Sequence, residues 1–291
     1  MSELRAAVFV AKPIPFKGQG LFNGEGLVGH WSPISCTLVY DKTSALLVDA
    51  PIDIENSKEL VAWIQKIAPG RVLETIYITH GHPDHWFGVP IVLEKFPNAK
   101  ILGTPGTIAH AKENVEPGYY SAVWGAWFDD VIPKERRWVF PEPLPEGNKF
   151  YIGGKWECEA IEVGHSDTCN TTILWIPALK LVVAGDVIYG QVHAMFAIAT
   201  TKAQRDEWLR AVDMVESLKP AYVIAGHQQA EEIHGNWNIA TTRAYIKDFE
   251  RLLGEVKARG GTSDDFYDEM MKLHGDRANP MVLRWGVKSN L

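Results

Sequence analysis

The chain has 291 residues, of which 46% are hydrophobic and 22% charged, a composition that can bury a large core. Its formal net charge is -7 and no basic run is visible, which argues against nucleic acid as a partner. Apolar stretches are far shorter than the roughly 20 residues that span a bilayer, and the apolar run at residues 6–11 is too short for a secretory signal. We therefore expect a cytoplasmic protein with no membrane partner.

Apolar runs separated by turn residues predict alternating strands and helices. Asn56 and Ser57 are good helix caps, so a helix is expected from there to Pro69. The other elements predicted for the first half are strands over 36–40, 45–49, 71–79 and 100–103 and helices over 91–95 and from 107. Those predicted for the second half are strands between 149 and 187, a helix over 203–218, a strand over 222–225 and a helix over 241–253. Two halves of this kind favour a layered α/β fold.

Residues 116–146 differ from the rest of the chain because they are rich in aromatic residues and proline but have no clear period. Their aromatic residues are Tyr119, Tyr120, Trp124, Trp127, Phe128 and Trp138. A long aromatic loop fits a lid over a small-molecule substrate. The same segment could instead form a satellite core or a contact between two copies of the chain. A homodimer is therefore a possible assembly.

The most informative motif follows the strand predicted over 71–79. Residues 80–85 read HGHPDH, and three more potential ligands each follow an apolar run and a glycine. The full set is His80, His82, Asp84, His85, His165, Asp186 and His227. Buried imidazoles and carboxylates side by side are costly unless a metal compensates them. Because alternate side chains of an extended segment point the same way, His80 and His82 can share one metal while Asp84 and His85 turn to a second.

This pattern resembles the metallo-β-lactamase-fold superfamily of hydrolases, from Asp49 to His227. The resemblance implies a four-layer αββα sandwich, with residues 1–291 forming a single domain. It places an aromatic insertion or lid at about residues 116–146 and C-terminal helices after residue 237.

The resemblance also implies a ligand set and a mechanism. His80, His82 and His165 would bind the first metal, Asp84, His85 and His227 the second, and Asp186 would bridge both. Two Zn²⁺ ions are expected, with Fe or Mn as other divalent choices, and a hydroxide between them would attack the substrate carbonyl. Asp84 would also guide a proton to the leaving group.

Two residues narrow the expected substrate class. True zinc β-lactamases of this superfamily have a cysteine where this chain has Asp186, whereas glyoxalase-like enzymes and lactonases have the aspartate. Tyr189 stands three residues later, as in the quorum-sensing lactonases, and is either an oxyanion donor or a tyrosine that only packs. Penicillins are therefore not the expected substrates.

Aromatic residues near the ligands are the candidates for substrate binding. Bulk at Trp86 could narrow the mouth of the site, and His193 would either contact substrate or serve as a structural histidine. The full candidate set is Trp86, Trp124, Trp127, Phe128, Tyr189, His193 and Phe196. By analogy with relatives, His30 and Trp31 would lean over the metals.

The leading hypothesis is a dinuclear zinc hydrolase that opens a lactone or lactam ring, that is, a cyclic ester, amide or carbamate. Its substrate would be a small apolar molecule, and its role xenobiotic detoxification, by analogy with members of the superfamily. The alternatives are a glyoxalase II-like thioesterase, an enzyme like the mononuclear iron persulfide dioxygenases, and a noncatalytic metal-binding protein.

Overall fold

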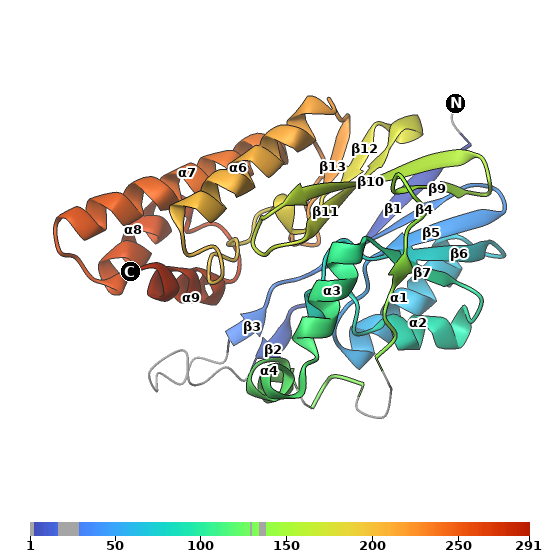
Figure 1. Cartoon of the computed structure of the whole chain (residues 1–291), viewed down its shortest axis with the longest axis horizontal. Helices are drawn as coiled ribbons and strands as arrows, with labels where there is room; N and C mark the ends of the chain where they lie inside the picture. The colour runs from blue at the N-terminus through green and yellow to red at the C-terminus, as the bar shows by residue number, and fades with distance from the viewer. Residues whose placement is uncertain (1–2, 17–28, 129, 134–137) are drawn as a thin grey trace.

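Two β-sheets lie face to face with helices on their outer surfaces (Figure 1), which is the expected four-layer αββα arrangement. The computed structural model describes residues 3–16, 29–128, 130–133 and 138–291. Among its described helices, none combines the length and the apolar character needed to cross a membrane.

The first sheet is built from the first half of the chain. Its strands, in spatial order, are β1 (Arg5–Val10), β4 (Ser35–Tyr40), β5 (Ser44–Val48), β6 (Val72–Tyr77), β7 (Lys100–Gly103) and β8 (Glu142–Pro143). The predicted hairpin is confirmed as β4 and β5, with Leu38 opposite Leu47. From β5 to β8 the strands are parallel, so their carboxyl ends lie at one edge of the sheet. A separate pair, β2 (Ile14–Phe16) and β3 (Gly29–Trp31), lies near helix α4 (Pro117–Ala122) in Figure 1.

The second sheet is built from the second half. Its spatial order is β13 (Tyr222–Ile224), β12 (Leu181–Val183), β11 (Thr171–Ile176), β10 (Trp156–Gly164) and β9 (Lys149–Ile152). The β12–β13 pair is parallel and the other pairs are antiparallel.

Helices cover the outer faces of both sheets (Figure 1). Those beside the first sheet are α1 (Ile54–Ile67), α2 (Val89–Lys95) and α3 (Pro105–Asn114). Those on the other side are α6 (Lys202–Ser217), α7 (Trp237–Ala258), α8 (Ser263–His274) and α9 (Pro280–Asn290). The predicted cap of α1 is wrong by one turn, because the Asp53 carboxylate, rather than Asn56 or Ser57, accepts from the Asn56 N–H at the helix start.

Alternating side chains of the central strands supply two cores. In β5, Leu46 and Val48 face the other sheet and pack with residues such as Phe150 and Leu174. Leu47 faces the opposite way, into the larger core beneath the helices. The strands are therefore buried on both faces, which explains why they read as continuous apolar runs in the sequence.

The aromatic segment is more regular than the sequence indicates. Residues expected to form an irregular loop fold into α4 (Pro117–Ala122) and α5 (Trp124–Phe128). The Trp124 indole is buried and donates from Nε1 to Asn114 Oδ1 at 2.8 Å, which ties α5 to the end of α3. Packing against the main core gives this segment a helical structure that its local pattern does not predict.

The glycines that precede three of the predicted ligands are needed for two different reasons. Gly164 and Gly185 have positive φ angles of 87° and 48°, a region that other residues rarely enter. Gly226 is needed for space, since a Cβ there would meet Asp186 Oδ1 and lie 2.6 Å from the Gly185 carbonyl carbon. The turns that carry the ligands are thus packed directly against one another.

Gly226→Ala should lower the free energy of unfolding by roughly 1–3 kcal/mol, the usual cost of overpacking. Gly254→Ala is the matched control, because its Cβ would lie in open space on the exposed side of α7. Urea unfolding of both variants measures the difference. An equal effect of the two substitutions would contradict the close approach at Gly226.

Candidate metal centre

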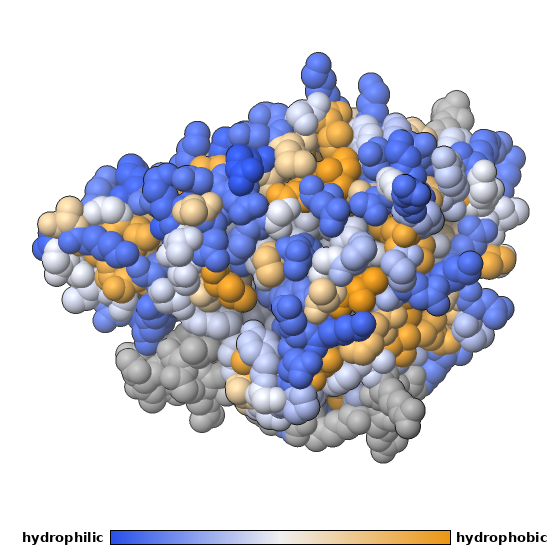
Figure 2. Space-filling view, viewed as in Figure 1, coloured by the Kyte–Doolittle hydropathy of each residue, from blue (hydrophilic) through white to orange (hydrophobic). Residues whose placement is uncertain are grey.

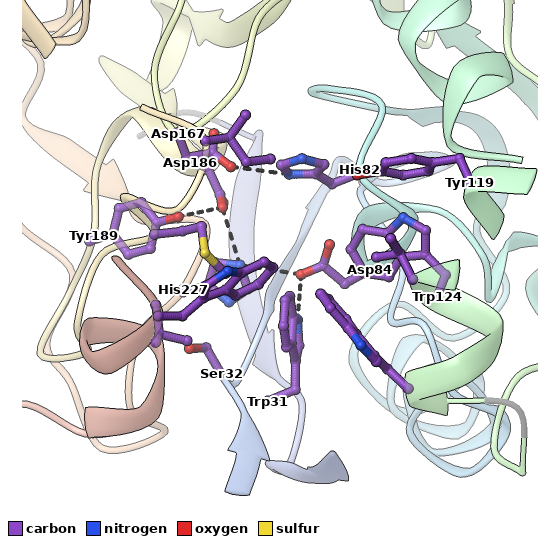
Figure 3. Close-up of a pocket in the computed structure, with 16 residues that line it drawn as sticks. Trp31, Ser32, His82, Asp84, Tyr119, Trp124, Asp167, Asp186, Tyr189 and His227 are labelled. Atoms are coloured by element: carbon purple, nitrogen blue, oxygen red, sulfur yellow. Dashed lines mark hydrogen bonds and ion pairs between the residues drawn. The ribbon is translucent and has the colours of Figure 1, made fainter. Parts of the chain in front are cut away.

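Buried histidine and carboxylate side chains gather where loops from both sheets meet (Figure 3). Three overlapping groups of side chains have ligand atoms within 4.8 Å of one another. The groups are His80, His85 and Asp186; Asp84, His85 and His227; and His80, His82 and Asp167. Six of the seven predicted ligands therefore lie together in the described structure, joined by one aspartate that the sequence did not single out.

Asp186 lies between the groups, as a bridging ligand should. Its Oδ1 is 3.2 Å from His85 Nε2, and its Oδ2 is 3.2 Å from His227 Nε2. It also shares a group with His80, which belongs to the first predicted site. Its position is compatible with contact to two ions.

His165 is not a member of the three groups. Its side chain is buried, and its Nδ1 is 2.7 Å from the backbone oxygen of Ser166. The seventh predicted ligand is thus in the same loop as Asp167 but is not among the residues that the structure gathers.

Unpaired buried atoms show that the site suits a cation. Asp186 Oδ1, Asp167 Oδ2 and His85 Nε2 are buried without a hydrogen-bond partner. A buried polar atom left unpaired usually costs about 1–3 kcal/mol, so such a concentration of unpaired atoms indicates a missing partner. Imidazole nitrogen and carboxylate oxygen are the donors that divalent first-row metals take in proteins. The residues present therefore fit the metal ions that the motif implies.

Each of three predicted ligands is oriented by a partner on its other ring nitrogen. His85 Nδ1 is 2.8 Å from Asp49 Oδ2, and His227 Nδ1 is 3.1 Å from the Pro33 oxygen. His80 Nδ1 is 3.1 Å from Thr79 Oγ1. These contacts leave Nε2 of each ring facing the site, as is usual for metal-binding histidines.

Asp49 is a positioning residue that the sequence analysis did not recognise. It follows β5 with a φ of 61°, an unusual conformation for a residue other than glycine. Its carboxylate accepts from the Thr79 N–H at 2.9 Å and from the Thr79 hydroxyl at 2.8 Å while holding His85. An acidic residue directly after the apolar run at residues 45–48 is the sequence signal that could have revealed it.

Two aromatic side chains hold the predicted carboxylate ligands. Trp31 donates from Nε1 to Asp84 Oδ2 at 2.7 Å, and the Tyr189 hydroxyl donates to Asp186 Oδ2 at 2.6 Å (Figure 3). Burial and the Asp186 charge raise the pKa of Tyr189 well above its ordinary value, so this hydroxyl keeps its proton. Tyr189 is committed to Asp186 in this structure, which favours a positioning role over the predicted oxyanion role.

The ring charges are set by competition between burial and nearby carboxylates. Burial disfavours the charged form of His85, but Asp186 and Asp49 raise its pKa well above the ordinary value. Burial likewise opposes protonation of His82 and His227, yet Asp167 raises the pKa of the first and Asp186 that of the second. Burial lowers the pKa of His80, and the neighbouring His85 lowers it further. The nearby carboxylates thus favour the protonated form of His82, His85 and His227, whereas His80 favours its neutral form.

An aromatic pocket opens beside the ligand atoms. Its wall contains Trp31, Trp124, Trp127, Trp285, Tyr119, Val123, Met195, Ile198 and Val282. No lysine or arginine is among the described residues that line it. Trp127 packs on Trp285 with ring centroids 5.0 Å apart, so α5 and the C-terminal helix α9 form one wall.

Three of the predicted substrate-binding residues line this pocket, namely Trp124, Trp127 and Tyr189. Phe128 lies directly behind it, with its ring 5.4 Å from that of Trp31. Trp31 also lines the pocket, while His30 on the same strand is exposed and lines a separate groove.

The other three predicted substrate-binding residues, Trp86, His193 and Phe196, do not line the pocket. Trp86 is fully buried and donates from Nε1 to the Gly81 oxygen at 3.0 Å. His193 pairs through Nδ1 with the Tyr245 hydroxyl at 2.7 Å, and Phe196 stacks on Phe249 at 3.9 Å. Each points into the core and is absent from the pocket wall, because aromatic character alone does not tell which side of a loop a residue faces.

Comparison with known proteins agrees with this geometry. The family model of the metallo-beta-lactamase superfamily matches residues 29–227. Hydroxyacylglutathione hydrolase 1 of Vibrio vulnificus (strain YJ016) is 36% identical over 65 residues, which make up 22% of this chain and 24% of that protein. The chain thus matches about a quarter of that relative's length.

Solved structures share the fold at low sequence identity. A metallo-beta-lactamase from Pontibacter korlensis has a TM-score of 0.57 and 17% identity, covering 84% of this chain and 99% of that one. The DIM-1 metallo-beta-lactamase exposed to ceftazidime has a TM-score of 0.57 and 21% identity, covering 84% of this chain and 97% of that one. These likenesses concern the fold alone.

Metal affinity should rise with pH across the neutral range. The raised pKa values of His82, His85 and His227 mean that metal must displace protons, so affinity falls as the pH drops below these values. Calorimetric titration of the metal-free protein between about pH 6 and pH 8, in buffers of different ionisation enthalpy, measures the protons released. Binding that neither depends on pH nor releases protons would contradict the charge state described above.

Tyr189→Phe should lower metal affinity by roughly 10–100-fold, the usual cost of losing a partner of a ligand. Turnover at saturating metal should change little. Tyr245→Phe, which removes a buried hydroxyl bonded to His193 instead, is the control and should bind metal normally. Unchanged metal affinity together with a ~10²–10³-fold loss of kcat would instead identify Tyr189 as the oxyanion donor.

Proposed function

The chain belongs to the metallo-beta-lactamase superfamily, whose hydrolases depend on metal ions, and we propose that it opens the lactone or lactam ring of a small, uncharged, apolar molecule. Cyclic esters, amides and carbamates are all within this class. We propose a pair of zinc ions as the resident metal and xenobiotic detoxification as the role.

The pocket wall is the observation that supports this substrate class. The predicted ligands Asp84, Asp186 and His227 lie at its inner end, while the outer wall consists mainly of indole rings and aliphatic side chains. Such a wall recognises an apolar ring by area burial and stacking, and it offers little to a charged group. A neutral cyclic molecule could therefore place its carbonyl at the metal end while its ring lies against the indoles.

The side chains of the site would have different roles in the proposed reaction. Bound divalent ions would polarise the carbonyl and lower the pKa of water, which makes a nucleophile available near neutral pH. The hydrogen bond from Trp31 fixes one oxygen of Asp84 and leaves Asp84 Oδ1 without a protein partner. That free oxygen is suited to pass a proton to the leaving group of the opened ring. The indoles of Trp124 and Trp127 would exclude bulk water.

A thioesterase is the second candidate, because the Vibrio relative is named a hydroxyacylglutathione hydrolase. The glutathione part of such a substrate carries carboxylates, which proteins usually bind with arginine or lysine. Among the described residues, the pocket wall offers neither. The described part of the pocket wall therefore favours a neutral ring over a glutathione thioester.

A substrate panel separates the two candidates. Zinc-loaded protein should be incubated with neutral lactones, lactams and cyclic carbamates, with carboxylate-bearing analogues of the same rings, and with glutathione thioesters. Mass spectrometry should show a neutral ring compound that gains one water without fragmenting, and its acidic analogue should react more slowly. Cleavage of the thioester while every ring survives would contradict the proposal in favour of the thioesterase.

The aromatic wall can be tested with the same substrate. Trp127→Ala should raise KM by roughly tenfold or more, since burying one large apolar side chain contributes about 1.5–3 kcal/mol. Trp237→Ala is the matched control, because Trp237 is half exposed and lies outside the pocket. Equal kinetics for the two variants would show that the indole wall does not bind the ring.

A further inference from the structure

Helix α9, the last helix of the chain, forms one side of the pocket wall. It lies outside the residues that the family model matches, yet it contributes Val282 and Trp285 to the wall. These two residues are three positions apart, so they lie on one face of the helix. Leu283 and Val287 are four positions apart, are buried in the main core, and are not among the described residues that line the pocket. Helix α9 thus presents one face to the pocket and another to the core.

Hydrogen bonds hold both ends of α9 beside the pocket. Asn279, directly before the helix, donates from Nδ2 to Ser32 Oγ at 2.7 Å, and Ser32 lines the pocket. Asn290, at the other end, donates from Nδ2 to the Phe196 oxygen at 2.9 Å. The buried Arg205 guanidinium donates to Asn290 Oδ1 at 2.7 Å, which orients that amide. The position of the helix is therefore fixed at both ends.

Trp285 closes the wall by touching Trp127 of α5. Their ring centroids are 5.0 Å apart and their planes meet at 85°, the edge-to-face arrangement of aromatic pairs in contact. The backbone next to Trp285 is closely packed, since a Cβ on Gly286 would lie 3.1 Å from Phe196 Cβ. A substrate group cannot pass between two rings in contact. The pocket therefore ends where α5 and α9 meet.

The exposed part of the lining shows where a substrate enters. Tyr119 is 45% exposed and Ile198 37%, whereas Trp127 is only 9% exposed. The mouth of the pocket therefore lies beside Tyr119 and Ile198 and not at the Trp127–Trp285 contact. A ring whose carbonyl lies at the metal end can extend a substituent toward the mouth, but a substituent that points to α9 meets the two indoles.

We propose that Trp285 is a specificity-determining residue, which with Trp127 limits the substrate to a compact neutral ring with at most a short substituent on the side that faces α9. This inference rests on the proposed ring-opening function and narrows its substrate class. Overpacking explains the limit, because a longer chain would have to force apart two indoles that the fixed ends of α9 hold together. Chains that point to the mouth are not limited in this way.

The test uses one type of lactone ring with unbranched alkyl chains of increasing length, attached at different ring positions. Turnover by the zinc-loaded full chain is followed by mass spectrometry. Binding is measured separately by calorimetric titration with cycloalkanones that carry the same chains, because these ketones have no ring bond that hydrolysis can open. Wild type is compared with Trp285→Ala, Trp285→Leu and Leu283→Ala, each checked for folding by circular dichroism. Leu283→Ala is the matched control, since it weakens the packing of α9 without changing the pocket wall.

In wild type, affinity and kcat/KM should fall by roughly tenfold or more beyond a certain chain length at one ring position, and not at the position that points to the mouth. Trp285→Ala should reverse most of this fall, so that the ratio of kcat/KM for the long-chain ring to that for the short-chain ring rises by about tenfold or more. Trp285→Leu should give a smaller rise, and Leu283→Ala should keep the wild-type ratio. The ratio is the readout because removal of an indole also lowers the affinity for every ring.

An unchanged ratio in both Trp285 variants, with rings still bound and opened, would overturn the inference and leave the proposed function intact. An equal rise in Leu283→Ala would also overturn it, because the packing of α9 and not the Trp285 indole would then set the limit. If the ketones show the length limit and its loss in Trp285→Ala but no lactone is opened, the size limit stands and the ring-opening function fails.

Discussion

The whole arrangement depends on the burial of several imidazoles and carboxylates at one end of the sandwich. Asp84, His85, Asp167 and Asp186 each keep an unpaired atom there, away from water. Such burial is costly, and the structure offsets only part of the cost with its own hydrogen bonds. Asp49 has an unusual backbone conformation, and its carboxylate contacts both Thr79 and His85. A strained residue and several unpaired atoms at one point mark a site shaped for a cation and not for maximal stability.

Neither sheet can form the site alone. The first sheet supplies the loop after β6, and the second supplies the turns after β10, β12 and β13. Hydrogen bonds join the two contributions, since Thr172 of β11 donates from its N–H and its hydroxyl to the Thr79 oxygen, at 3.1 and 2.6 Å. The N–H of Ser35 in β4 donates to the Gly226 oxygen at 2.8 Å, just before His227. The geometry of the site is thus fixed by the packing of the two halves against each other.

The pocket combines two environments that are usually kept apart. At its inner end, carboxylates and imidazoles that could hold a metal lie close together, while at its outer end the rings of Trp31, Trp124 and Trp127 form an apolar surface. Trp31 connects the two, because its ring packs on this wall while its N–H holds Asp84. A substrate bound against the indoles therefore touches the residue that orients a predicted ligand.

Figure 2 shows that apolar patches on the visible face of the molecule lie among many polar residues.

The sequence by itself determined the fold class and most of the site, because the ligands of the HGHPDH run are contiguous and later ligands follow strands and glycines that are readable locally. The tertiary structure decided the rest. Trp285 enters the wall from the last helix, and Trp31 reaches Asp84 across 53 positions, contacts that no local pattern records. It also decided that Trp86 and Phe196 face the core and that Asp167 lies in one group with His80 and His82. Residue type and spacing limit what a side chain can do, but the direction in which it points depends on how distant segments pack.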